Sequence, residues 1–223
     1  KEKITDTRAP KIQGILICPQ QGKGVVNGSS RKLELKTVTA KNGKQTITGK
    51  IEAWGEIGLA VKAYDYMDNT TNIYGVKDIT LRQDSQIIYH SNLDRFAFDE
   101  TRYLNSYVDY EEWKDRRSFY MRSFVEPGNR LRFNESVNRG IIHIGEEKTY
   151  HLTYTLSDAF GNTTRLSVWI EGKEQEIPEI ETEGTELFHW MSDNRFGAKG
   201  IRMTIPKGNL YDDLYFRYSV KED

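Results

Sequence analysis

The chain has 223 residues, with 33 acidic and 32 basic side chains and 12% aromatic residues. This balance of charge gives no electrostatic reason to expect binding to nucleic acid or to an anionic membrane, and no apolar run approaches the roughly 20 residues of a membrane span. Alanine is scarce and aromatic residues are common, so the composition indicates a mainly β protein.

The N-terminal part predicts a linker, a strand and a loop. Residues 1–10 are polar and end in a proline, and we expect a linker there. Residues 11–18 are apolar and β-branched, which predicts a strand that ends at Pro19. Residues 20–31 are rich in glycine, asparagine and serine, which is typical of a loop. Cys18 is the only cysteine in the sequence, so it has no partner for a disulfide and we expect a buried free thiol.

Alternating apolar residues predict further antiparallel strands over the next part of the chain. The Asn42-Gly43 pair signals a hairpin turn, and a second turn is predicted at Asp158–Asn162. The predicted strands lie at residues 57–65, 79–81, 87–89, 150–156 and 165–170. Half-buried strands joined by such turns favour an Ig-like antiparallel β-sandwich over residues 11–173.

One segment within this predicted sandwich lacks the strand pattern. Residues 101–119 place Leu104, Tyr107 and Val108 at helical spacing, with acidic residues before basic ones, which suits the helix dipole. We therefore predict a short inserted helix near residues 100–119. Asp99 and Glu100 precede it, and we interpret them as helix-capping residues, with a sugar-flanking carboxylate pair as the alternative.

The C-terminal part predicts a second, smaller β unit. Residues 174–186 are acidic and interrupted by proline, which is typical of an inter-domain linker. Residues 187–223 then contain two alternating apolar segments. A unit of this size is marginally stable alone, so we expect it to dock on the first domain or to be the start of a truncated one.

Few residues suggest metal binding or catalysis. The four histidines form no H-x-H or H-E-x-x-H pattern, so we expect no zinc site. Asp65, Asp68 and Asn69 are weak calcium candidates, and Asp158 with Asn162 offers similar oxygens. Neither set matches an EF-hand loop, and ordinary turn residues are the alternative interpretation.

An aromatic cluster is the main candidate for a binding surface. The candidate binding residues are Tyr103, Tyr107, Tyr110 and Trp113, which lie among charged side chains. Stacked aromatic faces beside polar groups are typical of carbohydrate-binding surfaces. The alternative is that an inserted helix uses these large residues to cover a sheet.

Several short blocks also carry a resemblance to a known family. They include Asp6-Thr-Arg-Ala-Pro10, Glu52-Ala-Trp-Gly55, Asp94-Arg-Phe-Ala-Phe-Asp99 and Arg102-Tyr-Leu-Asn-Ser106. These blocks resemble the region that follows the catalytic domain in lysostaphin-like zinc metallopeptidases of Gram-negative bacteria. That catalytic domain binds zinc through an H-x-x-x-D motif and an H-x-H motif, and we expect neither motif in this chain. The resemblance thus implies a non-catalytic accessory region, with no cofactor of its own and zinc only in an upstream domain.

The resemblance also implies partners and a location. Because the chain starts with lysine and not methionine, we expect a processed form or a piece of a longer protein. We expect it to position or regulate its own upstream peptidase domain, and to meet peptidoglycan or another envelope protein. A peptidoglycan substrate implies an extracytoplasmic location, periplasmic or associated with the outer membrane. The alternatives are a glycan- or peptidoglycan-binding module that uses the aromatic surface, and an Ig-like protein-interaction domain.

Overall fold

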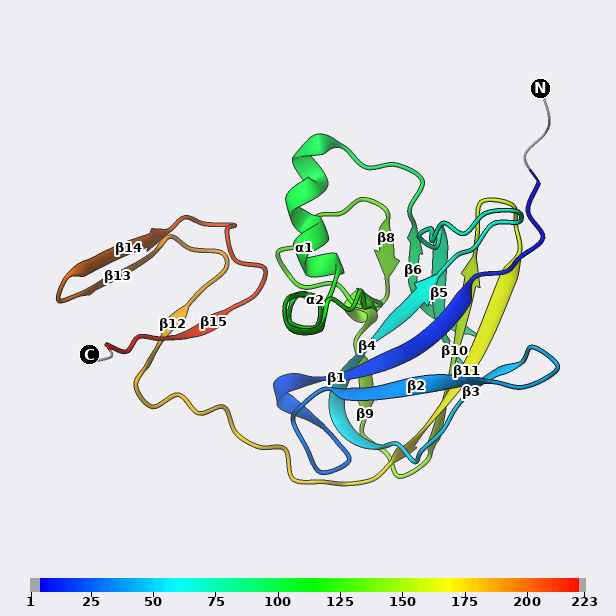
Figure 1. Cartoon of the computed structure of the whole chain (residues 1–223). Coiled ribbons are helices and arrows are strands. Elements are labelled where there is room, and N and C mark those ends of the chain that lie inside the picture. The colour runs from blue at the N-terminus through cyan, green and yellow to red at the C-terminus, as the bar shows by residue number, and fades with distance from the viewer. Residues whose placement is uncertain (1–4, 221–223) are drawn as a thin grey trace.

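A computed structural model describes residues 5–220 as a mainly β body, a helical segment packed on it and a small C-terminal unit (Figure 1). The strands of the body are β1 (Lys11–Val26), β2 (Leu33–Thr39), β3 (Gln45–Ile47), β4 (Glu52–Tyr64), β5 (Asp78–Gln83), β6 (Gln86–Asn92), β7 (Met121–Arg122), β8 (Asn134–Ser136), β9 (Ile142–Ile144), β10 (Thr149–Ser157) and β11 (Thr163–Gly172). The helical elements are the 3₁₀ turns η1 (Phe98–Tyr103) and η2 (Asn138–Gly140) and the helices α1 (Leu104–Tyr107) and α2 (Tyr110–Arg116). No helix in the part of the chain described here has the length and apolar character that a bilayer crossing requires.

The strands of the body form one large mixed sheet with β4 at its centre. The strand order is β3-β2-β1-β4-β11-β10-β5-β6-β8, and β7 and β9 also pair with β4. Most neighbours are antiparallel, but β11 meets β4 in parallel at the start of β4. The strands on both sides of β4 send side chains into one buried cluster, which includes Ile15 of β1, Leu59 of β4 and Val168 of β11. We call the strands β3-β2-β1-β4 and the strands β11-β10-β5-β6-β8 the two arms of the sheet. The main core therefore lies between these two arms.

The strands β1 and β4 are buried on both faces, which explains their nearly continuous apolar sequences. One face contributes to the main core. The other face carries a second cluster of buried residues, which consists of Leu16, Cys18, Ala60, Tyr120, Phe124 and Ile141. The last three of these residues belong to the segment between β6 and β9. This inserted segment thus covers the outer face of the central strands.

The structure corrects the predicted end of the first strand. β1 continues through Pro19 to Val26 and pairs with β4 on both sides of a register shift between Pro19 and Gly24. Pro19 itself pairs with Ile57 of β4, and the bulge follows it at residues 20–23. Because β2 pairs only with Gly14–Ile17, β1 has a partner strand on one side alone at Pro19, where a proline is tolerated. At Gly24 a Cβ would lie 1.9 Å from the carbonyl oxygen of Glu56, so only glycine fits there. Part of the predicted loop at residues 20–31 is therefore strand.

The two predicted hairpin turns are present. Asn42 and Gly43 lie between β2 and β3, and Gly43 has a φ of 82°, which favours glycine. Asp158 accepts hydrogen bonds at 2.8 Å from the backbone nitrogens of Phe160 and Asn162 in the turn between β10 and β11. These contacts are the Asx-type bonds that the sequence pattern predicts.

The predicted helix is present but broken. α1 ends at Tyr107 and α2 begins at Tyr110, because the chain is extended between them. There Val108 forms a β-bridge with Met121, and the nitrogen of Asp109 donates to the carbonyl oxygen of Tyr120. The backbone of this junction is thus held by the strand segment that follows. A helical period in sequence does not reveal such a tertiary contact.

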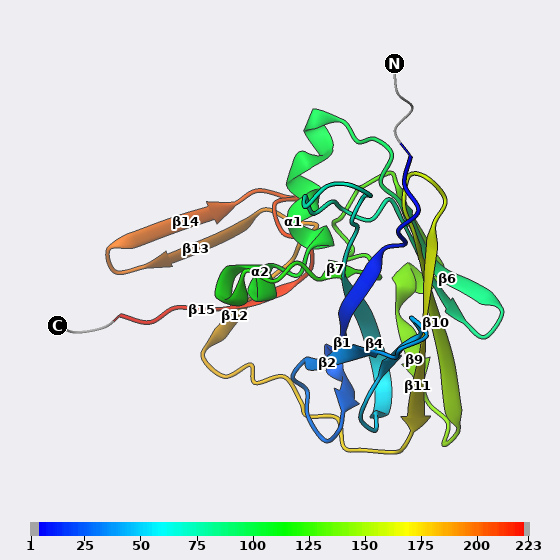
Figure 2. The same cartoon turned by 45° about the vertical axis from the view of Figure 1, so that its right-hand side comes forward.

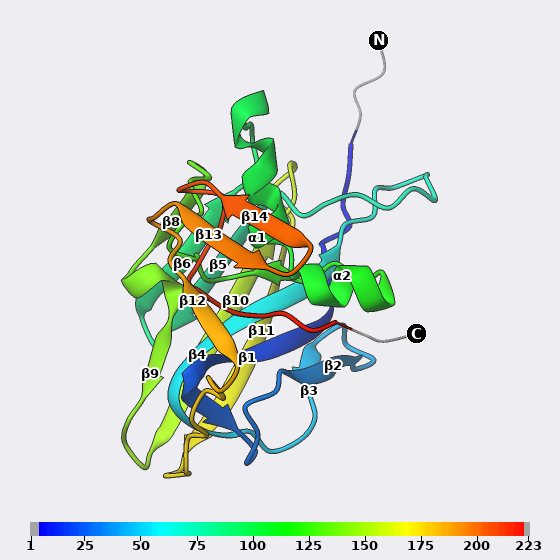
Figure 3. The ribbon, with the colours of Figure 1, turned by 90° about the vertical axis from the view of Figure 1, so that its left-hand side faces the viewer.

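The C-terminal unit consists of two short two-stranded sheets. They are formed by β12 (Thr185–Phe188) with β15 (Leu214–Arg217), and by β13 (Asn194–Ala198) with β14 (Ile201–Ile205). The unit extends from the body in Figures 1 and 2, and Figure 3 shows it from its own side, in front of the sheet. An extended segment connects it to β11.

Tyr211 attaches this unit to the helical segment of the body. Its ring packs edge-on against Tyr103, with ring centroids 6.4 Å apart, and its hydroxyl donates to the carbonyl oxygen of Arg102. Its own carbonyl accepts from the nitrogen of Gly128 at 2.7 Å. The unit therefore docks on the body as well as being tethered to it.

Replacing Tyr211 by alanine is expected to release this contact without unfolding the body. The side chain lies between two separately hydrogen-bonded β structures, so its loss should expose the connecting segment at residues 173–184. We expect limited proteolysis to cut this segment severalfold faster in the variant, while thermal unfolding of the body changes by less than about 1 kcal/mol. The Tyr211→Phe variant keeps the ring and should be cut at an intermediate rate. Equal cleavage rates for all three proteins would contradict the docking role.

Candidate functional site

An apolar groove lies where the helical segment meets the C-terminal end of β4. It has a volume of about 510 Å³. Its lining residues come from β4, the following loop, α1, α2 and the start of β7, and they are Ala63, Tyr64, Ile73, Tyr74, Gly75, Leu93, Leu104, Asn105, Tyr107, Val108, Tyr110, Trp113, Phe119 and Met121. We call this site the aromatic groove. Its volume is typical of ligand pockets, which span about 300–1,000 Å³.

Two aromatic rings from α2 form one wall of the aromatic groove. The Tyr110 and Trp113 rings lie 5.9 Å apart with an angle of 35° between their planes. The Tyr110 side chain is 55% exposed, and the guanidinium of Arg117 lies 4.8 Å from the centre of the Trp113 ring. The wall thus offers flat apolar faces beside a positive charge, an arrangement that suits a ligand with both apolar and polar edges.

The position of α2 is fixed by a buried carboxylate. Asp109 is fully buried and caps the helix by accepting from the nitrogen of Glu112. The same carboxylate pairs with Lys32 at 2.8 Å and with Arg122 at 3.1 Å. Burial opposes its ionisation, but the Arg122 and Lys32 charges outweigh burial and lower the pKa of Asp109. This network holds one wall of the aromatic groove against the central strands.

The structure separates the four predicted binding residues. Tyr110 and Trp113 line the aromatic groove with exposed or half-buried rings. Tyr107 also lines it but is buried, and its ring packs edge-on on Phe133 at 5.3 Å. Burial raises the pKa of Tyr107 to about 12. Tyr103 does not line the groove, because it packs against the C-terminal unit.

The remaining wall of the aromatic groove includes two residues that the sequence pattern did not single out. Ile73 and Tyr74 lie on the loop after β4, with 60% and 37% of their surface exposed. Two apolar residues in a polar, turn-rich segment are only a weak indication of a binding site. Their approach to α2 depends on the tertiary fold, which the local sequence does not show.

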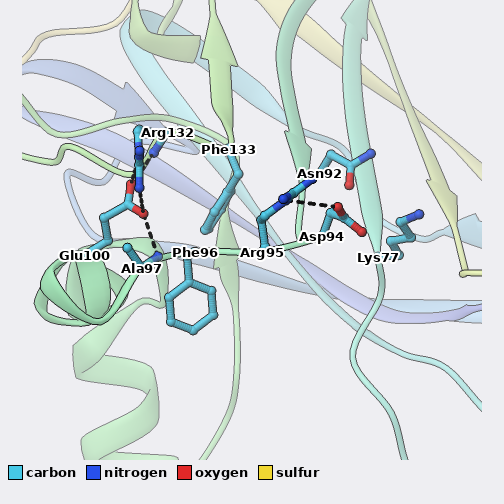
Figure 4. Close-up of a pocket in the computed structure, with 9 residues that line it drawn as sticks. All are labelled: Lys77, Asn92, Asp94, Arg95, Phe96, Ala97, Glu100, Arg132 and Phe133. Atoms are coloured by element: carbon cyan, nitrogen blue, oxygen red, sulfur yellow. Dashed lines mark hydrogen bonds and ion pairs between the residues drawn. The ribbon is translucent and has the colours of Figure 1, made fainter.

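A second hollow, of about 670 Å³, lies beside η1 (Figure 4). Glu100 and Arg132 face each other across one side of it, with two contacts of 2.9 Å. Glu100 also accepts from the nitrogen of Ala97 at 2.8 Å, which confirms the predicted capping role. The Arg132 and Ala97 contacts lower the pKa of Glu100 to about 2. A general acid or base needs a pKa near the working pH, so this carboxylate suits a structural role.

The histidines do not assemble the zinc site of the resembled family. His90 with Asp94, and His189 with Asp193, do stand at the H-x-x-x-D spacing, which corrects the expectation that this motif is missing. However, His90 Nε2 lies 2.8 Å from Asp78, and His189 Nδ1 lies 3.2 Å from Asp213. Within residues 5–220, neither histidine belongs to a group of three residues that could share one ion.

The predicted calcium candidates do not act as one set. Asp68 accepts from both the nitrogen and the hydroxyl of Thr7, at 2.9 and 2.8 Å, and Asn69 is an exposed turn residue with a φ of 58°. Asp65 instead lies beside Asp6 and Asp158, in a buried group of three carboxylates. The sequence pattern therefore identified Asp65 but not its neighbour from the N-terminal segment.

Cys18 is a buried free thiol, as the sequence predicted. It lies in the second core cluster, beneath the inserted segment. Burial, together with the nearby Asp109 charge, raises the pKa of Cys18 to about 12. A thiol with so high a pKa is a poor nucleophile, so this residue contributes packing rather than chemistry.

Comparison with known proteins gives one match. A family model described as a Zu5-like domain matches residues 185–223, the segment that contains the whole C-terminal unit. No curated protein and no solved structure matches the chain. The match covers β12 to β15, and the body that carries the aromatic groove lies outside it.

Proposed function

We propose that this chain is a non-catalytic accessory module of an exported peptidoglycan metallopeptidase, and that it binds the glycan of the cell wall in the aromatic groove. In this role it positions the catalytic domain, which lies upstream, on its substrate. Zinc belongs to that upstream domain. The observation that carries the proposal is the pair of aromatic faces, Tyr110 and Trp113, at the wall of a groove of ligand size.

The chemistry of the aromatic groove suits a sugar. One face of a pyranose ring carries mainly C–H groups, which pack on flat aromatic rings, while its edge carries hydroxyl and amide groups. The wall of the groove provides the rings, and the side chains of Asn105 and Arg117 lie in or beside it with donors for the sugar edge. A charged ligand is not required, which agrees with the apolar character of the lining residues.

The two buried carboxylates of the helical segment favour a binding role over a catalytic one. Glu100 is held ionised by Arg132, and the Asp109 carboxylate is buried in an ion-pair network. Both residues have lowered pKa values, unlike a carboxylic acid that must donate a proton at neutral pH. Together with the resemblance of the sequence blocks, this supports an accessory role.

We further propose that the body is an Ig-like sandwich and that it works outside the cytoplasm, in the periplasm or at the outer membrane. Two arms of strands enclose one core, and a parallel contact between β4 and β11 joins the arms. An Ig-like scaffold would present the inserted helical segment as its binding surface. A peptidoglycan ligand would be met only after export.

Retention on insoluble peptidoglycan tests the proposed function. We expect the wild-type chain to be retained, and the Trp113→Ala variant to bind about tenfold more weakly, which corresponds to about 1.4 kcal/mol. The matched control is Trp169→Ala, because Trp169 is 56% exposed and stacks on His151, outside the aromatic groove. This control should bind like the wild type.

Two results would overturn the proposal. Equal loss of binding in both tryptophan variants, or no retention of the wild type, would exclude a glycan site in the aromatic groove. Hydrolysis of purified peptidoglycan by this chain, abolished by a chelator, would exclude a purely accessory role. A peptidase domain encoded upstream in the same gene would support the proposed parentage.

A further inference from the structure

Three aspartates from distant parts of the sequence meet at one end of the sheet. Asp6 lies in the segment before β1, Asp65 follows β4, and Asp158 lies in the turn between β10 and β11. Each offers a carboxylate oxygen, and these three oxygens lie within 4.8 Å of one another. The fold therefore concentrates up to three negative charges in a space that a single ion could fill.

All three carboxylates are withdrawn from solvent. Asp6, Asp65 and Asp158 are 8%, 6% and 4% exposed. Asp158 is well supplied with donors, because its two oxygens accept from the turn nitrogens and from the Asn162 amide. Asp6 accepts from the nitrogens of Arg8 and Asp68 through Oδ1 only.

Two oxygens of this group are left without a hydrogen-bond donor. They are Asp6 Oδ2 and Asp65 Oδ1, which are both buried and have no partner among the residues described. They belong to two of the three carboxylates that approach one another. A buried, unpartnered carboxylate oxygen is costly unless a proton or a cation compensates for the lost water.

The side chains described around the group do not supply that compensation. No salt bridge within residues 5–220 involves any of the three aspartates. Arg8 is a cation whose charge acts on Asp65, but its guanidinium lies 5.3 Å from the Tyr66 ring and donates to the carbonyl oxygen of Met67. Burial, followed by the charges of Asp158 and Asp6, raises the pKa of Asp65, which is the direction expected for crowded carboxylates.

We propose that Asp6, Asp65 and Asp158 bind a calcium ion. Carboxylate oxygens are the ligands of hard cations, and Ca²⁺ binds oxygens at about 2.3–2.6 Å. Two ligands on opposite sides of such an ion are about 4.8 Å apart, so three oxygens within 4.8 Å of one another are close enough to reach one ion. The group contains no histidine or cysteine, so it does not suit zinc. Mg²⁺ dehydrates reluctantly and prefers fewer protein ligands, so we expect weaker binding.

The ion would hold three segments together. It would fix the chain before β1 to the ends of β4 and of the β10–β11 hairpin. Asn162 already bridges two of these segments, since its amide donates to Asp158 and to the carbonyl oxygen of Asp6. Asp65 also pairs through its backbone with Tyr74, so the ion would anchor the loop that forms one wall of the aromatic groove.

Calcium titration of the chelator-treated chain tests this site. We expect one saturable site by calorimetry, with a dissociation constant in the range of extracellular modules, about 10⁻⁴–10⁻³ M. Millimolar CaCl₂ should raise the midpoint of thermal unfolding by several degrees, and MgCl₂ should raise it less. The Asp65→Asn and Asp6→Asn variants should lose this shift. Without calcium, both variants should be at least as stable as the wild type, because each removes a buried negative charge.

The matched control is Asp68→Asn. Asp68 is next to the site in sequence and space, but its carboxylate is already bound by Thr7. This variant should keep the calcium-dependent shift. The proposal fails if calcium neither binds nor stabilises the wild type, if Asp65→Asn keeps the shift, or if Asp68→Asn loses it. It also fails if lowering the pH raises the midpoint of thermal unfolding of the calcium-free chain and CaCl₂ gives no rise of its own. None of these outcomes depends on peptidoglycan binding, so this test is separate from that of the proposed function.

Discussion

Replacement of Asp109 by alanine is expected to lower the free energy of unfolding by about 3–5 kcal/mol, the usual effect of removing one partner from a buried ion pair. The carboxylate is fully buried, and it serves Lys32, Arg122 and the first turn of α2 together. Without it, Glu126 would be the one remaining carboxylate that pairs with Arg122 among the described residues, and the Arg122 side chain is only 14% exposed. We expect chemical denaturation to report this loss.

Two further variants separate the charge from the helix cap. Asp109→Asn keeps a side chain that can cap α2 and should cost less than alanine. Glu111 also pairs with Lys32, but the Glu111 side chain is 69% exposed. Glu111→Ala should therefore change the free energy of unfolding by no more than about 1 kcal/mol. If Glu111→Ala were as destabilising as Asp109→Ala, burial would not be the source of the effect.

The contribution of Asp109 should also depend on pH in a defined direction. Its pKa is lowered in the folded chain, because the Arg122 and Lys32 charges outweigh the effect of burial. A lowered folded pKa stabilises the fold above the unfolded pKa of about 3.9, and this stabilisation is lost as the pH falls through the folded value. The difference in the free energy of unfolding between the wild type and Asp109→Ala should therefore be constant near neutral pH and decrease below a pH of about 4.

The second large effect is expected at the contact between Phe124 and Gly58. Phe124 is 8% exposed and belongs to the cluster between the inserted segment and the strands β1 and β4. Its ring occupies the space beside Gly58, where a Cβ would lie 2.4 Å from Phe124 Cδ1. Phe124→Ala should cost about 3–5 kcal/mol, and Gly58→Ala should cost about 1–3 kcal/mol through overpacking.

The double variant gives the decisive measurement. Once the Phe124 ring is removed, the methyl group at position 58 has room, so the two losses should not add. We expect the double variant to be less destabilised than the sum by about 0.5–3 kcal/mol. The Gly197→Ala control has open space at its Cβ and should change stability by less than about 0.5 kcal/mol. Additive losses would show that the inserted segment does not pack on β4 as described.

The sequence pattern predicted those elements whose period or turn chemistry is local. The hairpin at Asn42-Gly43, the turn at Asp158 and the alternating strands β10, β11 and β14 depend on residues within a few positions of each other. The helical spacing of residues 101–119 also predicted helical structure correctly, but it did not predict the break at Asp109. That break depends on the contact of Asp109 with Tyr120, which is made only in the folded chain.

The features that the sequence did not predict all require contacts between distant residues. Pro19 was expected to end a strand, but it pairs with Ile57 of β4 and the strand continues beyond the bulge that follows it. Tyr103 was grouped with the binding residues, yet the C-terminal unit covers it through Tyr211. Ile73 and Tyr74 join the aromatic groove, and Asp6 joins Asp65, because the fold brings together segments that show no shared pattern in the sequence.

The central place of β4 has a consequence for how the chain reaches its folded state. This strand pairs with β1, β7, β9 and β11, whose residues range from position 11 to position 172. The face of β4 that points into the main core cannot be buried until strands from both ends of the body have arrived. Such non-local pairing is typical of slow folding, on a scale of about milliseconds to seconds. Until then the apolar strands β1 and β4 stay exposed, and such exposed strands make a partly folded chain prone to aggregation.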